Sequence, residues 1–391
     1  MESRERVFAA LGGESVDQAP IDLGSSRVTS IPGDAPPRMI DFLDLPINRA
    51  DVPVADHMLQ LPELDERFLG ALGVDVRGVK INTVRKAPEF IETERHWEYL
   101  DEYGCRWRKP KQGGLYFDLV ESPLSGSLEA SDIDDFSWPD WTESRVFEGV
   151  AQAAKAFSDA GYAVVLEGEG GGIFETASRV RGYTDLYMDL ANNPALAGKL
   201  FDKIADLRCD LWRAAAEELS EVVHIVREGD DIAGQDKPPF APSTYPELLK
   251  PNHERVFRTI KEAFPPPTYV FFHSDGAIRE FIPDFVECGI DILNPRQLGL
   301  PGMDLRGIAA EYGDRIAFWG GGADPQAVQP TSSPDAIRRE IRERVRGVLG
   351  VPPRYVFSSI HNVLGDLPSE NVIEQLQGLH EAQGLTFEVQ R

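Results

Sequence analysis

The sequence predicts an α/β protein of the (β/α)8 or TIM barrel class, with a β-hairpin inserted in its N-terminal part. After Trp141, short apolar runs rich in β-branched residues alternate with long helical stretches, the pattern of βα units around a parallel sheet. With two earlier runs they make eight predicted strands, the number that closes such a barrel. The 391 residues, 42% of them hydrophobic, are enough for one barrel with one insertion. We therefore expect a single domain over residues 1–391.

The predicted elements follow in chain order. Residues 4–11 predict a short helix closed by Gly12-Gly13, and residues 19–24 predict the first barrel strand. The Pro- and Asp-rich residues 31–64 predict loop and short helix over one barrel end. The insertion covers about residues 93–126, where aromatic and polar residues alternate on both sides of Gly113-Gly114. The other strands are predicted near Val76 and at residues 163–166, 222–226, 269–272, 290–293, 316–319 and 355–357, and the helices between them at 195–219, 245–264, 278–288, 334–349 and 368–383.

The charge balance excludes whole classes of function. The chain has 40 Lys and Arg against 65 Asp and Glu, a formal charge of -25, which repels nucleic acids and anionic membrane surfaces. No run approaches the roughly 20 apolar residues of a membrane span, and the N-terminus lacks the apolar core of a signal peptide. The three cysteines lack the spacing of a zinc or redox motif. We expect a cytoplasmic protein that acts on a small molecule.

Ionisable residues gather where the predicted strands end. In a barrel of parallel strands, the residues directly after the strands converge on one rim, where barrel enzymes hold their active sites. The candidates for substrate binding at this rim are Asp22, Glu167, Glu169, Asn294, Gln297, Asp324 and Asn362. The candidates for catalysis are Glu228, Asp230, Asp231, His273 and Asp275, and His361 is a further candidate metal ligand.

His273 and Asp275 are the best candidates for the reaction centre. One residue separates them at a strand end, so both side chains can face the barrel mouth, as metal ligands or as a base and its orienting acid. The alternative is that Asp275 caps the helix that starts near Ala277, while His273 makes a hydrogen bond inside the barrel.

The three acids Glu228, Asp230 and Asp231 follow an apolar strand within four residues. Such crowding either raises the pKa of a carboxyl group or recruits a cation. Alternatively, one acid caps the loop and the others are solvated. In the insertion, Trp97, Tyr99, Tyr103 and Trp107 line a substrate pocket or pack across strands, and the sequence leaves both options open.

Several segments together resemble the uroporphyrinogen decarboxylase-like superfamily, in the branch that includes the corrinoid-dependent methyltransferases. The resemblance spans nearly the whole chain, in order and spacing. It is carried by Arg4 to Leu11 with Asp17 to Pro20, Glu228 to Gln235, Tyr245 to Pro251, Phe272 to Ile278, Asp291 to Gln297, Trp319 to Asp324 and His361-Asn362.

Two departures from the family limit what the resemblance implies. The decarboxylases hold the carboxylates of their substrate with an arginine-rich N-terminal motif, and this chain has only Arg27 there. The methyltransferases that activate a thiol hold zinc with His-x-Cys and a later cysteine, where this chain has His273-Ser-Asp275 and a segment ending in His361. A zinc site made of His273, Asp275, Glu228 and His361 is harder and more Lewis-acidic, which favours polarising an oxygen over activating a thiol.

The resemblance and these departures give a working hypothesis. We expect an O-demethylase-like methyltransferase that moves a methyl group from a small methylated substrate to a corrinoid on a partner protein, assisted by zinc. The second hypothesis is a metal-independent decarboxylase or lyase that acts on a small carboxylated substrate. The third is a barrel that binds a small molecule or a corrinoid protein without chemistry. A homodimer is compatible with all three.

Overall fold

The computed structural model describes residues 1–33, 35–47, 54–84, 89–114, 116–295, 300, 302–323, 332–349, 354–359 and 367–390. Four predicted site residues, Gln297, Asp324, His361 and Asn362, lie outside these ranges. The fold prediction is confirmed, because seven strands form one parallel sheet in the order β13-β12-β11-β10-β9-β8-β3. They are β3 (Val76–Lys80), β8 (Ala163–Glu167), β9 (Ile225–Gly229), β10 (Tyr269–Ser274), β11 (Ile292–Pro295), β12 (Ala317–Gly321) and β13 (Tyr355–Ser358).

The first predicted strand closes this sheet into a barrel, although it is reduced to a single bridge. Ile21 pairs in parallel with Phe357 of β13. On its other side, the carbonyl of Ile21 accepts a hydrogen bond of 2.8 Å from the amide of Asp75, next to β3. The last strand is thereby joined to the second, and the strand order round the barrel is the order along the chain.

The two faces of each strand have different partners, because successive side chains point to opposite sides. One cluster of buried residues fills the barrel interior, and α1 (Ser3–Gly12) adds Val7 and Leu11 to it. The alternate residues, such as Leu166 and Phe272, belong to the larger cluster under the surrounding helices. The interior cluster consists of Val7, Leu11, Val76, Ala163, Val165, Ile225, Phe271, Ile292, Ala317, Trp319 and Val356.

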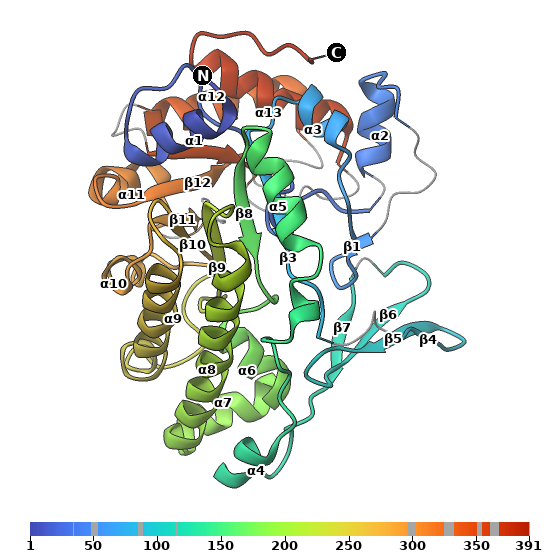
Figure 1. The fold of residues 1–391 in the computed structure, drawn as a ribbon, viewed down its shortest axis with the longest axis vertical. Helices are drawn as coiled ribbons and strands as arrows, with labels where there is room; N and C mark the ends of the chain where they lie inside the picture. Colours follow the sequence, from blue (N-terminus) through green and yellow to red (C-terminus); the bar gives the residue numbers. More distant parts are fainter. Residues whose placement is uncertain are drawn as a thin grey trace.

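Helices surround the sheet, and Figure 1 shows α5, α8 and α9 beside β8 to β10. Both termini lie at the same end of the view. In the described ranges no helix has the length and apolar character needed to cross a membrane. The other helices are α2 (Ala35–Phe42), α3 (Glu66–Ala71), α4 (Ala130–Asp135), η1 (Ser144–Val146), α5 (Val150–Asp159), α6 (Ile173–Arg181), α7 (Tyr183–Asn192), α8 (Pro194–Leu219), η2 (Tyr245–Leu249), α9 (Lys250–Ala263), α10 (Ile282–Cys288), α11 (Leu305–Tyr312), α12 (Pro334–Leu349) and α13 (Ser369–Ala382).

The N-terminal insertion is larger than the predicted hairpin. It is a four-stranded antiparallel sheet of β4 (Ile91–Glu92), β5 (His96–Leu100), β6 (Arg106–Pro110) and β7 (Asp118–Glu121). The carboxylate of Asp101 accepts hydrogen bonds from the amides of Tyr103 and Cys105, which builds a turn that the alternating pattern did not reveal. A small pair of strands, β1 (Val54–Asp56) and β2 (Leu61–Pro62), precedes it. Figure 1 shows the insertion projecting from the barrel on the β3 side.

Candidate functional site

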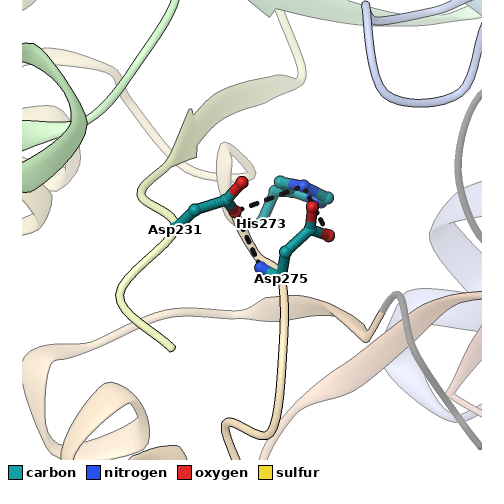
Figure 2. A group of neighbouring side chains, drawn as sticks. All are labelled: Asp231, His273 and Asp275. Atoms are coloured by element: carbon teal, nitrogen blue, oxygen red, sulfur yellow. Dashed lines mark hydrogen bonds and ion pairs between the residues drawn. The ribbon is translucent and has the colours of Figure 1, made fainter. Parts of the chain in front are cut away.

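Three side chains meet at the C-terminal end of β10. The Nε2 atom of His273 lies 3.3 Å from Oδ1 of Asp275 and 3.8 Å from Oδ1 of Asp231. The Asp231 oxygen also accepts a hydrogen bond of 2.7 Å from the amide of Asp275, which ties the loop after β9 to the end of β10 (Figure 2). His273 is buried and Asp231 is partly exposed. The predicted pair of His273 and Asp275 is thus brought together with a third predicted acid.

Neighbouring groups fix the orientation of the His273 ring. Its Nδ1 atom lies 2.5 Å from Oδ1 of Asn294, at the end of β11. The amide nitrogen of Asn294 donates to the carbonyl of Trp319, which can only accept, so the Asn294 oxygen must face the ring. His273 therefore carries a proton on Nδ1 and turns Nε2 toward the two carboxylates. Trp319 is held in turn, because its indole N–H donates to Asp22 at 2.9 Å.

This geometry suits a divalent metal ion. The lone pair of a neutral Nε2 repels carboxylate oxygens at these distances, so a proton or a cation must lie between them. One ligand atom from each of Asp231, His273 and Asp275 lies within 4.8 Å of the others. Zinc accepts imidazole nitrogen and carboxylate oxygen, and the buried hydrogen bond to the second ring nitrogen is typical of metal-bound histidines. The three residues present therefore fit such an ion.

The structure corrects the predicted roles of the other two acids after β9. The strand continues to Gly229, three residues beyond the end of the predicted strand at 222–226, and its alternation turns Glu228 away from the barrel interior. There its carboxylate pairs with Arg208 of α8 at 2.6 Å and accepts the indole N–H of Trp212. Glu228 is therefore not in the cluster of Asp231, His273 and Asp275, where Asp231 takes the place predicted for it.

Asp230 likewise points outward, to a helix terminus. Its two oxygens accept hydrogen bonds of 2.8 and 2.9 Å from the amides of Phe174 and Glu175, in the first turn of α6. His253 of α9 lies 3.0 Å from the same carboxylate. A carboxylate that satisfies the free N–H groups of a helix is a structural cap. Asp230 therefore holds α6 and α9 against the barrel.

A cavity of about 500 Å³ lies between the insertion and the rim near β3 and β8. The insertion contributes Tyr99, Tyr103 and Trp107, so three of the four aromatics considered from the sequence line a pocket. From the barrel side, Glu169 and Arg27 line it. The three residues of the His273 cluster are not in its lining.

Glu169 is the titratable group of this cavity. Burial, opposed by Arg208, Arg179 and Arg27, raises the pKa of Glu169 to about 7. A carboxyl group with such a pKa can exchange a proton at neutral pH, which suits general acid or base chemistry. Its predicted role as a substrate-binding residue remains a prediction, as does that of Asp22, whose carboxylate accepts from Ser25 as well as from Trp319.

Two arginines that the sequence reading did not select lie beside the predicted Glu167. The Oε1 atom of Glu167 is 3.2 Å from Nε of Arg27 and 3.4 Å from Nη1 of Arg227. Arg227 and Glu167 are partners on adjacent strands. A predicted strand that ran on to Gly229 would have revealed Arg227, because side chains alternate along a strand and Arg227 lies on the same face as the interior residue Ile225.

Comparisons with known proteins agree with this fold. The family model described as uroporphyrinogen decarboxylase (URO-D) matches residues 120–381. A methyltransferase from Methanosarcina mazei has a TM-score of 0.66 and 16% identity, covering 97% of this chain and 99% of its own. A β-glycosidase from Thermosphaera aggregans reaches 0.44 and 11% identity, covering 82% and 85%. Among curated proteins, none matches. The first structure shows a shared fold along the whole chain.

Proposed function

The chain belongs to the uroporphyrinogen decarboxylase family, and from this premise we propose that it is a methyltransferase of the O-demethylase type. It would take a methyl group from an oxygen of a small methylated substrate and pass it to a corrinoid carried by a partner protein. The observation that supports this most is the cluster of Asp231, His273 and Asp275 at the barrel mouth. The full-length similarity in fold to a methyltransferase supports the same reaction class.

The residues of the cluster determine which chemistry the site favours. Asp231, His273 and Asp275 would hold a zinc ion, which when bound acts as a Lewis acid toward the oxygen that leaves as the methyl group departs. A set of two carboxylates and one imidazole puts less negative charge on zinc than thiolates do, so it suits an oxygen better than a sulfur leaving group. Asn294 accepts the Nδ1 proton of His273 and so directs its Nε2 atom at the site.

The cavity beside the insertion would admit the substrate. Its volume of about 500 Å³ lies within the usual range for small-molecule pockets, and its mixture of aromatic and ionisable walls is typical of them. Glu169, with its raised pKa, would exchange a proton with a group of the substrate that lies in this cavity.

Metal analysis of the purified protein tests the proposal. We expect zinc in equimolar amount in the wild type and its loss in the His273→Ala variant. With 4-methoxybenzoate as donor and cob(I)alamin as acceptor, formation of methylcobalamin should disappear together with the metal. His380→Ala is the matched control, because His380 is also buried but lies on α13, where its ring contacts the carbonyl of Leu376. The His380→Ala variant should keep both the bound zinc and the formation of methylcobalamin.

The same experiment separates the proposal from its alternative. A metal-independent decarboxylase would contain no bound metal and would release CO2 from a carboxylated substrate without a corrinoid. Unchanged metal content and activity in the His273→Ala variant contradict the proposed site.

A further inference from the structure

Arg227 lies in the barrel interior, immediately below His273. Its neighbour two residues earlier, Ile225, belongs to the interior cluster, and strand alternation puts Arg227 and Gly229 on the same side. Gly229 is the residue of β9 that pairs with His273 of β10. The side chain of Arg227 therefore starts one layer below the metal cluster and on the adjacent strand.

The absence of a side chain at Gly229 lets the guanidinium reach the level of His273. A Cβ atom at this position would lie 2.8 Å from Nη2 of Arg227 and 3.1 Å from Cβ of His273. The guanidinium and the histidine thus flank the same point at the barrel mouth. A larger residue at 229 would push one of them away.

The protein gives this guanidinium few acceptors. The Arg227 side chain is more than nine-tenths buried, and its Nε is enclosed without a hydrogen-bond partner. Within the described ranges its side chain makes one ion contact, Nη1 to Oε1 of Glu167 at 3.4 Å, and donates no hydrogen bond. A guanidinium has five N–H donors, and leaving an enclosed donor such as this Nε without an acceptor is costly.

The one acidic partner is shared. Arg27 approaches the same Oε1 atom at 3.2 Å, and the other oxygen of Glu167 accepts the backbone amide of Arg27. Burial lowers the pKa of Arg227, against the attraction of Glu167. The neighbouring acid Glu228 cannot help, because it points outward to Arg208. Arg27 also pairs with Asp56, at 3.4 Å, whereas the one acid that Arg227 contacts in the described ranges is this shared Glu167.

We propose that Arg227 binds a carboxylate of the substrate at the barrel mouth beside His273, so that the substrates are small methylated carboxylic acids. The inference rests on the proposed function, because it places the anionic group next to the metal cluster. The planar fork of a guanidinium matches a carboxylate with two parallel hydrogen bonds, and such charge-assisted pairs are strong in a buried site. A neutral substrate would leave the Arg227 donors unused.

Binding of matched probe pairs tests this recognition directly. Isothermal titration calorimetry would compare methoxyacetate with methoxyacetamide, and 4-methoxybenzoate with 4-methoxybenzamide, on the protein as purified. Each pair has nearly the same shape and differs in charge. We expect the wild type to bind at least one carboxylate about 10-fold to 100-fold more tightly than its amide. In Arg227→Met this preference should vanish while affinity for the amide stays the same.

Two further variants separate recognition from folding. Arg77→Met is the matched control, because Arg77 is an equally buried arginine of a barrel strand, β3, and pairs with Glu66 at 2.7 Å, away from the cavity and from His273. It should lose stability but keep the preference for the carboxylate. If Arg227→Met does not fold, Arg227→Lys keeps the charge without the fork, and its carboxylate preference should fall to an intermediate value. The free energy of unfolding of each variant is measured by urea titration.

Three outcomes overturn the inference. They are equal affinity of the wild type for carboxylate and amide, no binding of either carboxylate, and an undiminished preference in the Arg227 variants. Titration requires neither turnover nor a corrinoid. A chain that binds carboxylates through Arg227 but lacks metal and methyl transfer would refute the proposed function and leave this inference standing.

Discussion

Replacing Asp230 with alanine should destabilise the fold by about 3–5 kcal/mol while leaving the metal site intact. The carboxylate is fully buried and accepts hydrogen bonds from the amides of Phe174 and Glu175 at 2.8 and 2.9 Å. Hydrogen bonds to a charged acceptor contribute roughly 1.5–3 kcal/mol each. The truncation also removes the partner of the Nε2 atom of the buried His253, at 3.0 Å.

The neighbouring residue provides the matched comparison. Asp231→Ala removes a carboxylate of the same size one position later, but this side chain is partly exposed and belongs to the proposed metal site with His273 and Asp275. Asp231→Ala should therefore cost less stability than Asp230→Ala and should lower the zinc content. Stability is measured by urea denaturation followed by circular dichroism, and zinc by mass spectrometry.

The two variants test whether Asp230 caps α6 while Asp231 binds the metal ion. Asp230→Ala with near-wild-type stability would refute the capping role. Loss of zinc from folded Asp230→Ala, with zinc retained in Asp231→Ala, would show that the two acids have been assigned the wrong way round.

Three other predictions concern the site and the cavity. Asn294→Leu should weaken zinc binding about 10-fold to 100-fold, because the Nδ1 proton of His273 loses its acceptor; chelator competition measures this, and unchanged affinity argues against the orientation role. Burial raises the pKa of Glu169 to about 7, above that of an unfolded glutamate, so its contribution to stability is present at acidic pH and is lost as pH rises toward 7. In Glu169→Gln the free energy of unfolding should no longer show this decrease, which is up to about 3 kcal/mol between pH 4.5 and 7. A decrease as steep as in the wild type would contradict this prediction. Gly229→Ala should fold but bind 4-methoxybenzoate less tightly than the wild type, because its Cβ would meet Arg227 at 2.8 Å; titration calorimetry with unchanged affinity argues against the close approach.

Much of the fold follows from local patterns in the sequence. The alternation of apolar runs and helical stretches predicts parallel βα units, and all seven strands of the main sheet lie at or beside the predicted positions. The pair of His273 and Asp275 is also predictable, because residues two apart at a strand end share a face. The first strand was less predictable, since a bridge at Ile21 depends on its neighbours rather than on its own residues.

The sequence by itself determined the barrel and the His273–Asp275 pair, whereas the tertiary structure decided which acids and cations join them. Glu228 and Arg227 are adjacent in sequence, but one faces α8 and the other the interior, because β9 runs to Gly229 and each residue along a strand reverses the face. The contact of Arg227 with Glu167 and that of His273 with Asn294 join separate strands. No local pattern encodes such contacts, since they arise only when the strands are aligned in register in the closed sheet.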